Sequence, residues 1–237
     1  MSRIFDIYTN IDLLTEENTF VYSMDEKMGV TAREHISNKQ LMKPGVCERI
    51  DPEYKRHGTT GIIASLNIAT GEIVNPLVQQ TRTELDLLTH ITGVIKINET
   101  AEHIFLVDNL NTHVSESLVK MVAEYEGMDL DELGKKGKCG ILENKTTRRS
   151  FLENPKHKIR FVYTPKHCSW LNQIECWFSI ITRALLNRRL SVVSVEELED
   201  KIHKFINYYN TFMKKPFDWS KPKNLLRFDH YFRLKWL

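Results

Sequence analysis

The chain has 237 residues, of which 41% are hydrophobic and 27% charged, so its length fits one large domain with a core of its own. It has no run of about 18 apolar residues and no basic segment followed by an apolar stretch at its start, so we expect neither a membrane span nor a secretory signal. Its four cysteines form no Cys-x-x-Cys pair, which is typical of reduced thiols rather than of a disulfide framework.

Charge is distributed unevenly along the chain, although the net charge is only +2. Residues 1–143 carry 14 Lys/Arg and 23 Asp/Glu, whereas residues 144–237 carry 19 and 8. A basic half of this kind can face a polyanion, or it can simply solvate helices. Charge alone leaves both interpretations open.

The first third of the chain predicts mainly strands. Residues 1–17 are expected to form a short leader helix, and 18–27 an apolar strand that ends in carboxylates. Residues 58–80 contain two β-rich runs joined by a hairpin turn at Ala69-Thr70-Gly71. The apolar spacing of 81–95 then predicts a helix.

The middle of the chain alternates between strands and helices. Residues 103–113 are a second apolar run ending in Asp, and 115–127 predict a helix that Ser115 caps. The segment 127–158 is polar and poorly periodic, and 157–165 form a third apolar run.

Two further helices are expected near the end. One covers roughly 169–188, and the other covers 194–213, with Ser194 and Glu197 in capping-box spacing. The last residues, 214–237, form a basic aromatic tail. Three strands, a helix, a strand, a helix, a strand and two helices together predict an α/β fold with a mixed sheet.

Three acids stand at positions where metal chemistry is plausible. Asp25 and Asp108 each end an apolar strand, and Glu175 lies on the shoulder of the apolar stripe of the 169–188 helix. Each acid alone is explained as well by a turn, a cap or a solvated helix surface. Together they supply the hard oxygen ligands with which two divalent ions promote phosphodiester cleavage.

Four blocks of sequence carry a resemblance to a known family. They are TFVYSMDEK (19–27), YKRHGTTGIIASLNIATGEI (54–73), IFLVDNLNTH (104–113) and RFVYTPKHCSWLNQIECWFSIITRALL (160–186). In this order they resemble the DDE transposases, specifically the mariner-like superfamily of bacterial insertion sequences. The resemblance extends from about residue 18 to about residue 219.

The resemblance implies an RNase H-like fold, with a mixed five-stranded sheet and helices on both faces. It implies a catalytic domain over 18–213 in which Asp25, Asp108 and Glu175 are the catalytic residues and hold two Mg²⁺ or Mn²⁺ ions. The implied reaction is cleavage of DNA at transposon ends and joining to target DNA at TA dinucleotides. Glu26 is a neighbour of the first acid and not a candidate ligand.

Further residues are expected to support these acids or to contact DNA. Asn109, His113 and Asn172 lie beside the matched acids and are the supporting candidates. The candidate phosphate contacts, which would position DNA without reading its sequence, are Arg148, Arg149, Lys166, His167, Arg183, Arg188 and Arg189.

Two features depart from the family pattern. Asp108 and Glu175 are 67 positions apart, which marks 127–158 as a basic insertion that is either a DNA- or dimer-facing element or a solvated loop. Such transposases normally begin with helix-turn-helix domains, whereas here the first catalytic strand is expected from residue 18. We therefore expect end recognition to involve a separate helix-turn-helix polypeptide, as for a fragment, a split reading frame or a decayed copy.

The expected partners are double-stranded DNA and a second copy of the chain, at the nucleoid in the cytoplasm. Two alternatives stay open. One is a catalytically silent remnant that binds DNA or a partner transposase. The other is an RNase H-like nuclease acting on RNA–DNA hybrids, which the glutamate in Leu-Asn-Gln-Ile-Glu disfavours.

Overall fold

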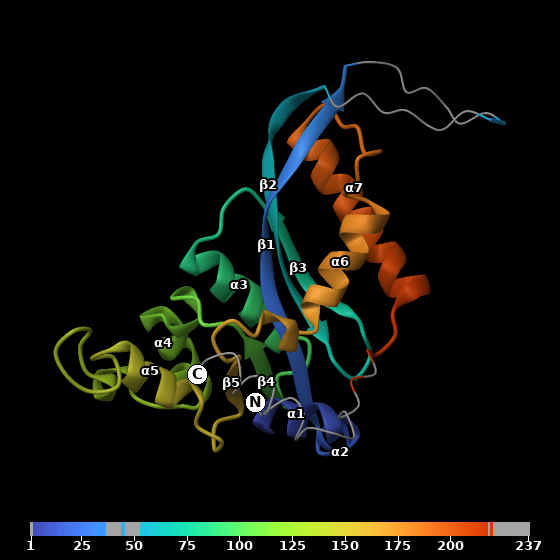
Figure 1. Ribbon diagram of the computed structural model, residues 1–237. Coiled ribbons are helices and arrows are strands. Elements are labelled where there is room, and N and C mark those ends of the chain that lie inside the picture. Colours follow the sequence, from blue (N-terminus) through green and yellow to red (C-terminus); the bar gives the residue numbers. More distant parts are fainter. Residues whose placement is uncertain (1, 37–43, 46–52, 218, 220–237) are drawn as a thin grey trace, which may run out of the picture.

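A mixed sheet of five strands in the order β3-β2-β1-β4-β5 forms the centre of the chain in the computed structural model (Figure 1). The structure describes residues 2–36, 44–45, 53–217 and 219. The strands are β1 (Thr19–His35), β2 (Tyr54–Asn67), β3 (Ile73–Gln79), β4 (Glu102–Val107) and β5 (Ile159–Tyr163). The α-helices are α1 (Ser2–Thr9), α2 (Ile11–Glu16), α3 (Glu84–Ile95), α4 (Glu116–Tyr125), α5 (Lys145–Leu152), α6 (Ile174–Ala184) and α7 (Val195–Tyr208).

The connections between the strands determine this order. β1, β2 and β3 follow one another and pair antiparallel, whereas β4 and β5 are reached through helices and therefore lie parallel to β1. Three antiparallel strands followed by two parallel ones make the sheet of the RNase H-like fold, as the sequence predicts. β1 is the central strand and contributes to both halves.

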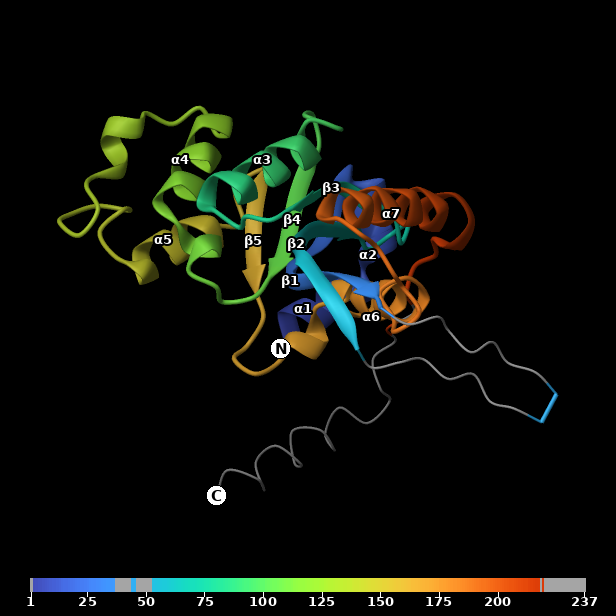
Figure 2. The same ribbon diagram turned by 90° about the horizontal axis from the view of Figure 1, so that it is seen from above.

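Helices cover both faces of the sheet, which confirms the predicted layering (Figures 1 and 2). On one face α1, α6 and α7 enclose a core that includes the fully buried Trp177. On the other face α3, α4 and α5 enclose a second core around Phe105 and Phe161, whose rings stack 5.4 Å apart. Because both faces of β1 and β4 are buried, polar side chains on these strands need a specific reason to be there.

Local sequence signals account for the ends of several elements. Thr83 forms a capping box with Asp86 at the start of α3, and the Ser115 and Ser194 hydroxyls cap α4 and α7. The predicted hairpin between β2 and β3 turns through Gly71, whose φ of 72° lies in the left-handed region that favours glycine.

β1 and β2 extend well beyond the rest of the sheet as a pair of long antiparallel strands (Figure 1). We call this extension the arm; it consists of residues 28–36, which are the second half of β1 and the residue after it, and residues 54–60 of β2. Side chains and backbone near α7 brace it. The Thr60 hydroxyl donates to Glu199 at 2.6 Å, and the Val192 amide donates to the Arg33 carbonyl at 2.8 Å.

Four expectations on elements need correction. β1 continues to His35, whereas this strand was expected to end at residue 27. The leader is two short helices, α1 and α2, rather than one. The polar segment 127–158 contains a 3₁₀ turn and the helix α5, which Asn144 caps with two hydrogen bonds. The helix expected at 169–188 is divided into a 3₁₀ turn at Ser169–Leu171 and α6. Of the tail, residues 218 and 220–237 lie outside the described residues.

No helix among the described residues is long and apolar enough to cross a membrane.

Candidate active site

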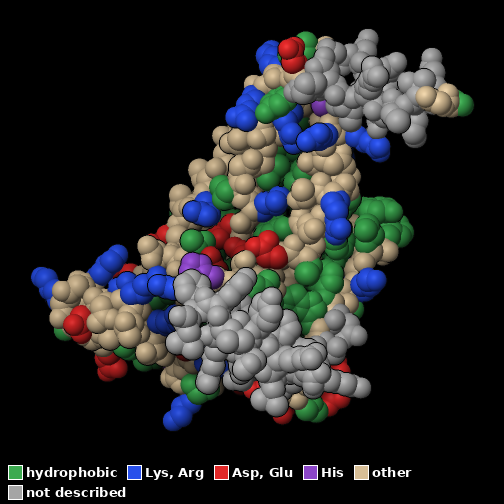
Figure 3. Space-filling model, viewed as in Figure 1, with side chains coloured by type: hydrophobic (Ala, Val, Ile, Leu, Met, Phe, Trp, Pro, Cys, Tyr) green, Lys and Arg blue, Asp and Glu red, His purple; other side chains and the backbone are tan. Residues whose placement is uncertain are grey.

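Asp25 and Asp108 are brought together where the parallel pairing of β1 with β4 ends. The last parallel pair is Ser23 with Leu106; Asp25 lies two residues further along β1, which continues to His35, and Asp108 lies just beyond the end of β4. Side chains two residues apart point to the same face of a sheet, so both acids face the layer that contains α6. Figure 3 shows acidic side chains gathered between β1 and α6, with Lys and Arg side chains around them.

The environment of Asp25 disfavours its negative charge. Burial raises the pKa of Asp25 to about 7, against a 2.8 Å hydrogen bond from the Glu26 amide, and the charges of Asp108 and Glu26 raise it further. The carboxylates of Asp25 and Asp108 therefore repel each other when no cation lies between them.

Asp108 is more exposed and is held in its ionised form. Burial opposes ionisation, but the His113 ring and a 2.9 Å hydrogen bond from the Leu110 amide keep the pKa of Asp108 below its usual range. His113 Nδ1 lies 2.8 Å from Asp108 Oδ1. Burial alone would lower the pKa of His113, yet its contacts with Asp108 and Glu26 raise it to about 9.

Asn172 ties the start of the α6 layer to β1. Its side-chain amide donates to the Met24 carbonyl at 2.9 Å and to Asp25 Oδ2 at 3.3 Å, and its oxygen accepts from the Ser23 hydroxyl. The Ile174 amide donates to the same Ser23 hydroxyl at 2.8 Å. Asn172 is fully buried, so these bonds replace its contacts with water.

Glu175 lies in the first turn of α6, three residues after Asn172, with an exposed side chain. It borders an open cavity beside α6 that is also lined by Trp170, Arg183 and Trp219. Its negative charge at the N-terminus of a helix is favoured by the helix dipole. The structure therefore brings Asp25 and Asp108 together, with Glu175 at the edge of the same layer.

The residues present fit a divalent cation, although they do not form a closed cage. Among the described residues, no three His, Cys, Asp or Glu side chains are close enough to hold a metal ion by themselves. The repulsion within the Asp25–Asp108 pair and the all-oxygen donor set are nevertheless what a hard cation requires. Mg²⁺ usually keeps several waters, so two carboxylates can anchor one ion.

The helix α5 contacts the loop that follows Asp108. Arg149 donates to the Asn109 side-chain oxygen at 2.9 Å and lies 4.4 Å over the Tyr163 ring, while Arg148 donates to the Val114 carbonyl at 2.9 Å. Asn109 in turn donates to the Thr164 carbonyl. Both guanidinium groups thus bind within the fold and hold this loop, and their DNA contacts stay a prediction.

The other candidate DNA contacts lie around the acids. Lys166 and His167 are exposed in the loop after β5, at the same sheet edge as Asp108. Arg183 is exposed on α6, two turns after Glu175, and Arg188 and Arg189 are exposed just beyond that helix.

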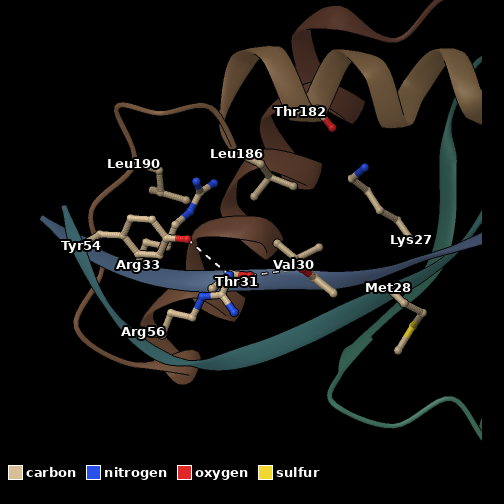
Figure 4. Close-up of a pocket in the computed structure, with 11 residues that line it drawn as sticks. Lys27, Met28, Val30, Thr31, Arg33, Tyr54, Arg56, Thr182, Leu186 and Leu190 are labelled. Carbon is tan, nitrogen blue, oxygen red and sulfur yellow. Dashed lines mark hydrogen bonds between the residues drawn. The ribbon is translucent and has the colours of Figure 1, made fainter. Parts of the chain in front are cut away.

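Sequence reasoning missed a basic cavity of about 280 Å³ between the arm and the end of α6. Figure 4 shows Lys27, Arg33 and Arg56 lining it. The Arg33 and Arg56 guanidinium groups lie 5.6 Å and 5.8 Å from the Tyr54 ring centre. One sequence signal pointed to this cavity. Lys27 is two residues from Asp25 on the same strand, so its side chain lies on the same face of the sheet.

Comparisons with known proteins identify the family to which the chain belongs. The family described as DDE superfamily endonuclease matches residues 20–199. No curated protein sequence matches significantly. Two solved structures are similar: the Mos1 mariner paired end complex with Mn (12% identity, TM-score 0.46) and the Mos1 strand transfer complex (12%, 0.28).

The match covers 87% and 92% of this chain but only 56% and 64% of those two chains. Likenesses this distant carry no argument about function, so the assignment depends on the family match.

Proposed function

Because the chain belongs to the DDE superfamily endonucleases, we propose that it is the catalytic domain of a transposase, in which Asp25, Asp108 and Glu175 hold divalent metal ions for DNA cleavage and strand transfer. The observation that carries the proposal is the proximity of Asp25 to Asp108, just past the last parallel pair of β1 and β4 and inside the family match. All three acids fall within the matched residues.

Divalent ions bound there would supply Lewis acidity at the attacking and leaving oxygens of the phosphodiester. The chain's own residues orient the ligands. Asn172 donates to Asp25 and His113 contacts Asp108, so neither carboxylate is free to turn away. Glu175 is the proposed third ligand, and the Asn172–Ser23 contacts fix the start of its helix against β1.

The same proposal gives DNA a path across the face that carries the acids. Lys166 and Arg183 are exposed on that face, and Lys27 extends it toward the arm cavity with Arg33 and Arg56. Cations spaced along one face bind the phosphate backbone without reading sequence.

Finer points come from the family resemblance and belong to the same proposal. They are two Mg²⁺ or Mn²⁺ ions, insertion at TA dinucleotides, a homodimer that joins two ends, and action at the nucleoid. Recognition of particular ends is assigned to a helix-turn-helix module outside these 237 residues, on the same or another polypeptide.

A cleavage assay with matched variants tests the proposal. Nicking and strand transfer on plasmid DNA should depend on Mg²⁺ or Mn²⁺ and fall to background in Asp108→Asn and Glu175→Gln. Glu196→Gln is the control for Glu175→Gln, because Glu196 is also an exposed acid in the first turn of a helix.

The outcomes separate the alternatives. Cleavage that is lost in both site variants and retained in Glu196→Gln supports the proposal. DNA binding without cleavage and without metal binding at these acids would instead favour a DNA-binding remnant. Cleavage restricted to RNA–DNA hybrids would favour the other nuclease class.

A further inference from the structure

Glu26 is a buried carboxylate directly behind the paired aspartates. It follows Asp25 in β1, so its side chain points to the opposite face of the sheet. That side chain is 1% exposed, and its Oε1 lies 3.4 Å from His113 Nε2. Since His113 Nδ1 lies 2.8 Å from Asp108 Oδ1, one imidazole ring joins the buried acid to the candidate metal ligand.

A carboxylate in this position is costly for the fold. Glu26 shares the face of β1 on which Met24 joins the second core, and within the described residues neither of its oxygens has a hydrogen bond of good geometry. Burying an acid without full partners lowers stability, and an apolar residue of similar size would pack more favourably. Packing therefore does not explain why an acid stands here.

The contacts in the loop after β4 suggest a role for Glu26. Asp108 lies just beyond the last strand residue, where, among the residues that the structure describes, the Leu110 amide and His113 contact its carboxylate oxygen Oδ1. The backbone of His113 is fixed by the Tyr163 hydroxyl, which donates to its carbonyl at 2.7 Å. The ring is fully buried, and its Nδ1 also lies 3.3 Å from the Asp108 carbonyl oxygen, so Glu26 is the group that faces its second nitrogen.

We propose that Glu26 and His113 are positioning residues that hold Asp108 in the orientation in which it binds a metal ion. Glu26 faces Nε2, so Nδ1 is kept toward Asp108, and the carboxylate is oriented before the cation arrives. Preorganising a ligand from behind raises metal affinity without adding a ligand. This inference rests on the proposed function, because it concerns the same site.

Mn²⁺ binding to the purified full chain, measured by calorimetry without DNA, tests the inference directly. Glu26→Gln keeps the size of the side chain and should weaken Mn²⁺ binding by about 10- to 100-fold. Glu34→Gln is the matched control, because it removes the acid from another His–Glu pair, His57 Nε2 to Glu34 Oε2 at 2.7 Å. His113→Asn should resemble Glu26→Gln.

A second readout separates positioning from loss of structure. In Glu26→Gln, DNA affinity should stay near wild type, the melting temperature should not fall, because the buried carboxylate is itself costly, and saturating Mn²⁺ should restore cleavage. Asp108→Asn should not be restored in this way, because there the ligand itself is changed.

The two possible failures are distinguishable. If Asp108→Asn abolishes Mn²⁺ binding while Glu26→Gln binds like wild type, the positioning role is overturned and the proposed function stands. If Asp108→Asn binds Mn²⁺ like wild type, there is no metal site at Asp108, and both the proposed function and the positioning role are overturned.

Discussion

At the scale of single residues, the Asn172 side chain connects the segment before α6 to β1 and to Asp25. Asn172 breaks the helix expected at 169–188, because its φ of −91° and ψ of 106° are extended and its amide bonds to β1 rather than to its own helix. The break lets α6 begin at Ile174, so that Glu175 lies in a first turn.

Asn172→Ala should lower both stability and metal binding. It removes bonds to Ser23, Met24 and Asp25 and leaves buried partners unsatisfied, which costs about 1–3 kcal/mol. Urea unfolding and Mn²⁺ titration measure the two effects. Asn207→Ala, at an exposed position of α7, is the control and should lower neither. A variant that is less stable but binds Mn²⁺ normally would show that Asn172 acts only on the fold.

His90 gives the fold a pH dependence with a definite sign. Burial lowers the pKa of His90 to about 4, although the Asn75 carbonyl, 2.7 Å from Nδ1, and the charge of Glu26 oppose this shift. The Ser65 hydroxyl faces the other ring nitrogen at 2.8 Å. In the unfolded chain a histidine titrates near 6.5, so below that pH the unfolded state binds the extra proton.

The stability contributed by neutral His90 is therefore complete above pH 6.5 and is lost as the pH falls toward 4. Between pH 7.5 and pH 5 wild type should lose about 2 kcal/mol more than His90→Gln, which cannot titrate. Urea unfolding at the two pH values measures this difference. Equal losses in the two proteins would contradict the assignment.

At the scale of elements, the sequence is sufficient for the succession of strands and helices and for a mixed sheet, and the family resemblance adds helices on both of its faces. Apolar runs predict each strand, and the caps Ser115 and Ser194 begin helices where they were expected. The helix α5 was missed because only Phe151 and Leu152 are buried in it, which is too few for a periodic signal. β1 was predicted too short because beyond Lys27 it pairs with β2 as an arm and loses its apolar pattern.

The candidate site was predicted less completely than the fold. Asp25 and Asp108 could be placed because strand ends and register determine their position. The contacts of Arg149 with Asn109 and of Glu26 with His113 depend on loops whose shape no local pattern specifies. For the same reason, a sequence pattern cannot separate a basic residue that braces a loop from one that meets DNA.

The β2–β3 turn gives a test of an element boundary. A Cβ on Gly71 would lie 2.0 Å from the Lys215 carbonyl oxygen, so Gly71→Ala adds a backbone clash to the strain of a positive φ. Gly127 has a φ of 69° and nothing within 4 Å of such a Cβ. Thermal unfolding should show a loss of about 1–2 kcal/mol in Gly127→Ala, from strain alone. Gly71→Ala should lose more, and equal losses would mean that the segment at Lys215 is not packed there.

At the scale of the whole molecule, the uneven charge of the sequence becomes a spatial arrangement. The acids of β1 and β4 form the centre of one face, and cations from the arm and from the basic second half surround them (Figure 3). A polyanion that binds these surrounding cations has to pass over the acids. A bound divalent ion would offset the repulsion between the polyanion and the carboxylates.

Salt dependence of DNA binding tests this arrangement. Each phosphate contact contributes about 0.9 to the slope of log K against log salt, so Arg56→Ala and Lys166→Ala should each reduce the slope by about that amount. Lys204→Ala, an exposed cation that pairs with Asp200 on α7, should leave it unchanged. Fluorescence anisotropy across a salt series measures the slope, and three identical slopes would exclude both contacts.

The central position of β1 in the sheet has a consequence for folding of the nascent chain. β1 precedes β4 and α6 along the chain, and these two elements, which complete its surroundings, are made roughly 80 and 150 residues later. At about 5–20 residues per second, Asp25 waits on the order of 10–30 s for the segment that ends in Glu175. The proposed metal site is therefore assembled only after α6 has been made.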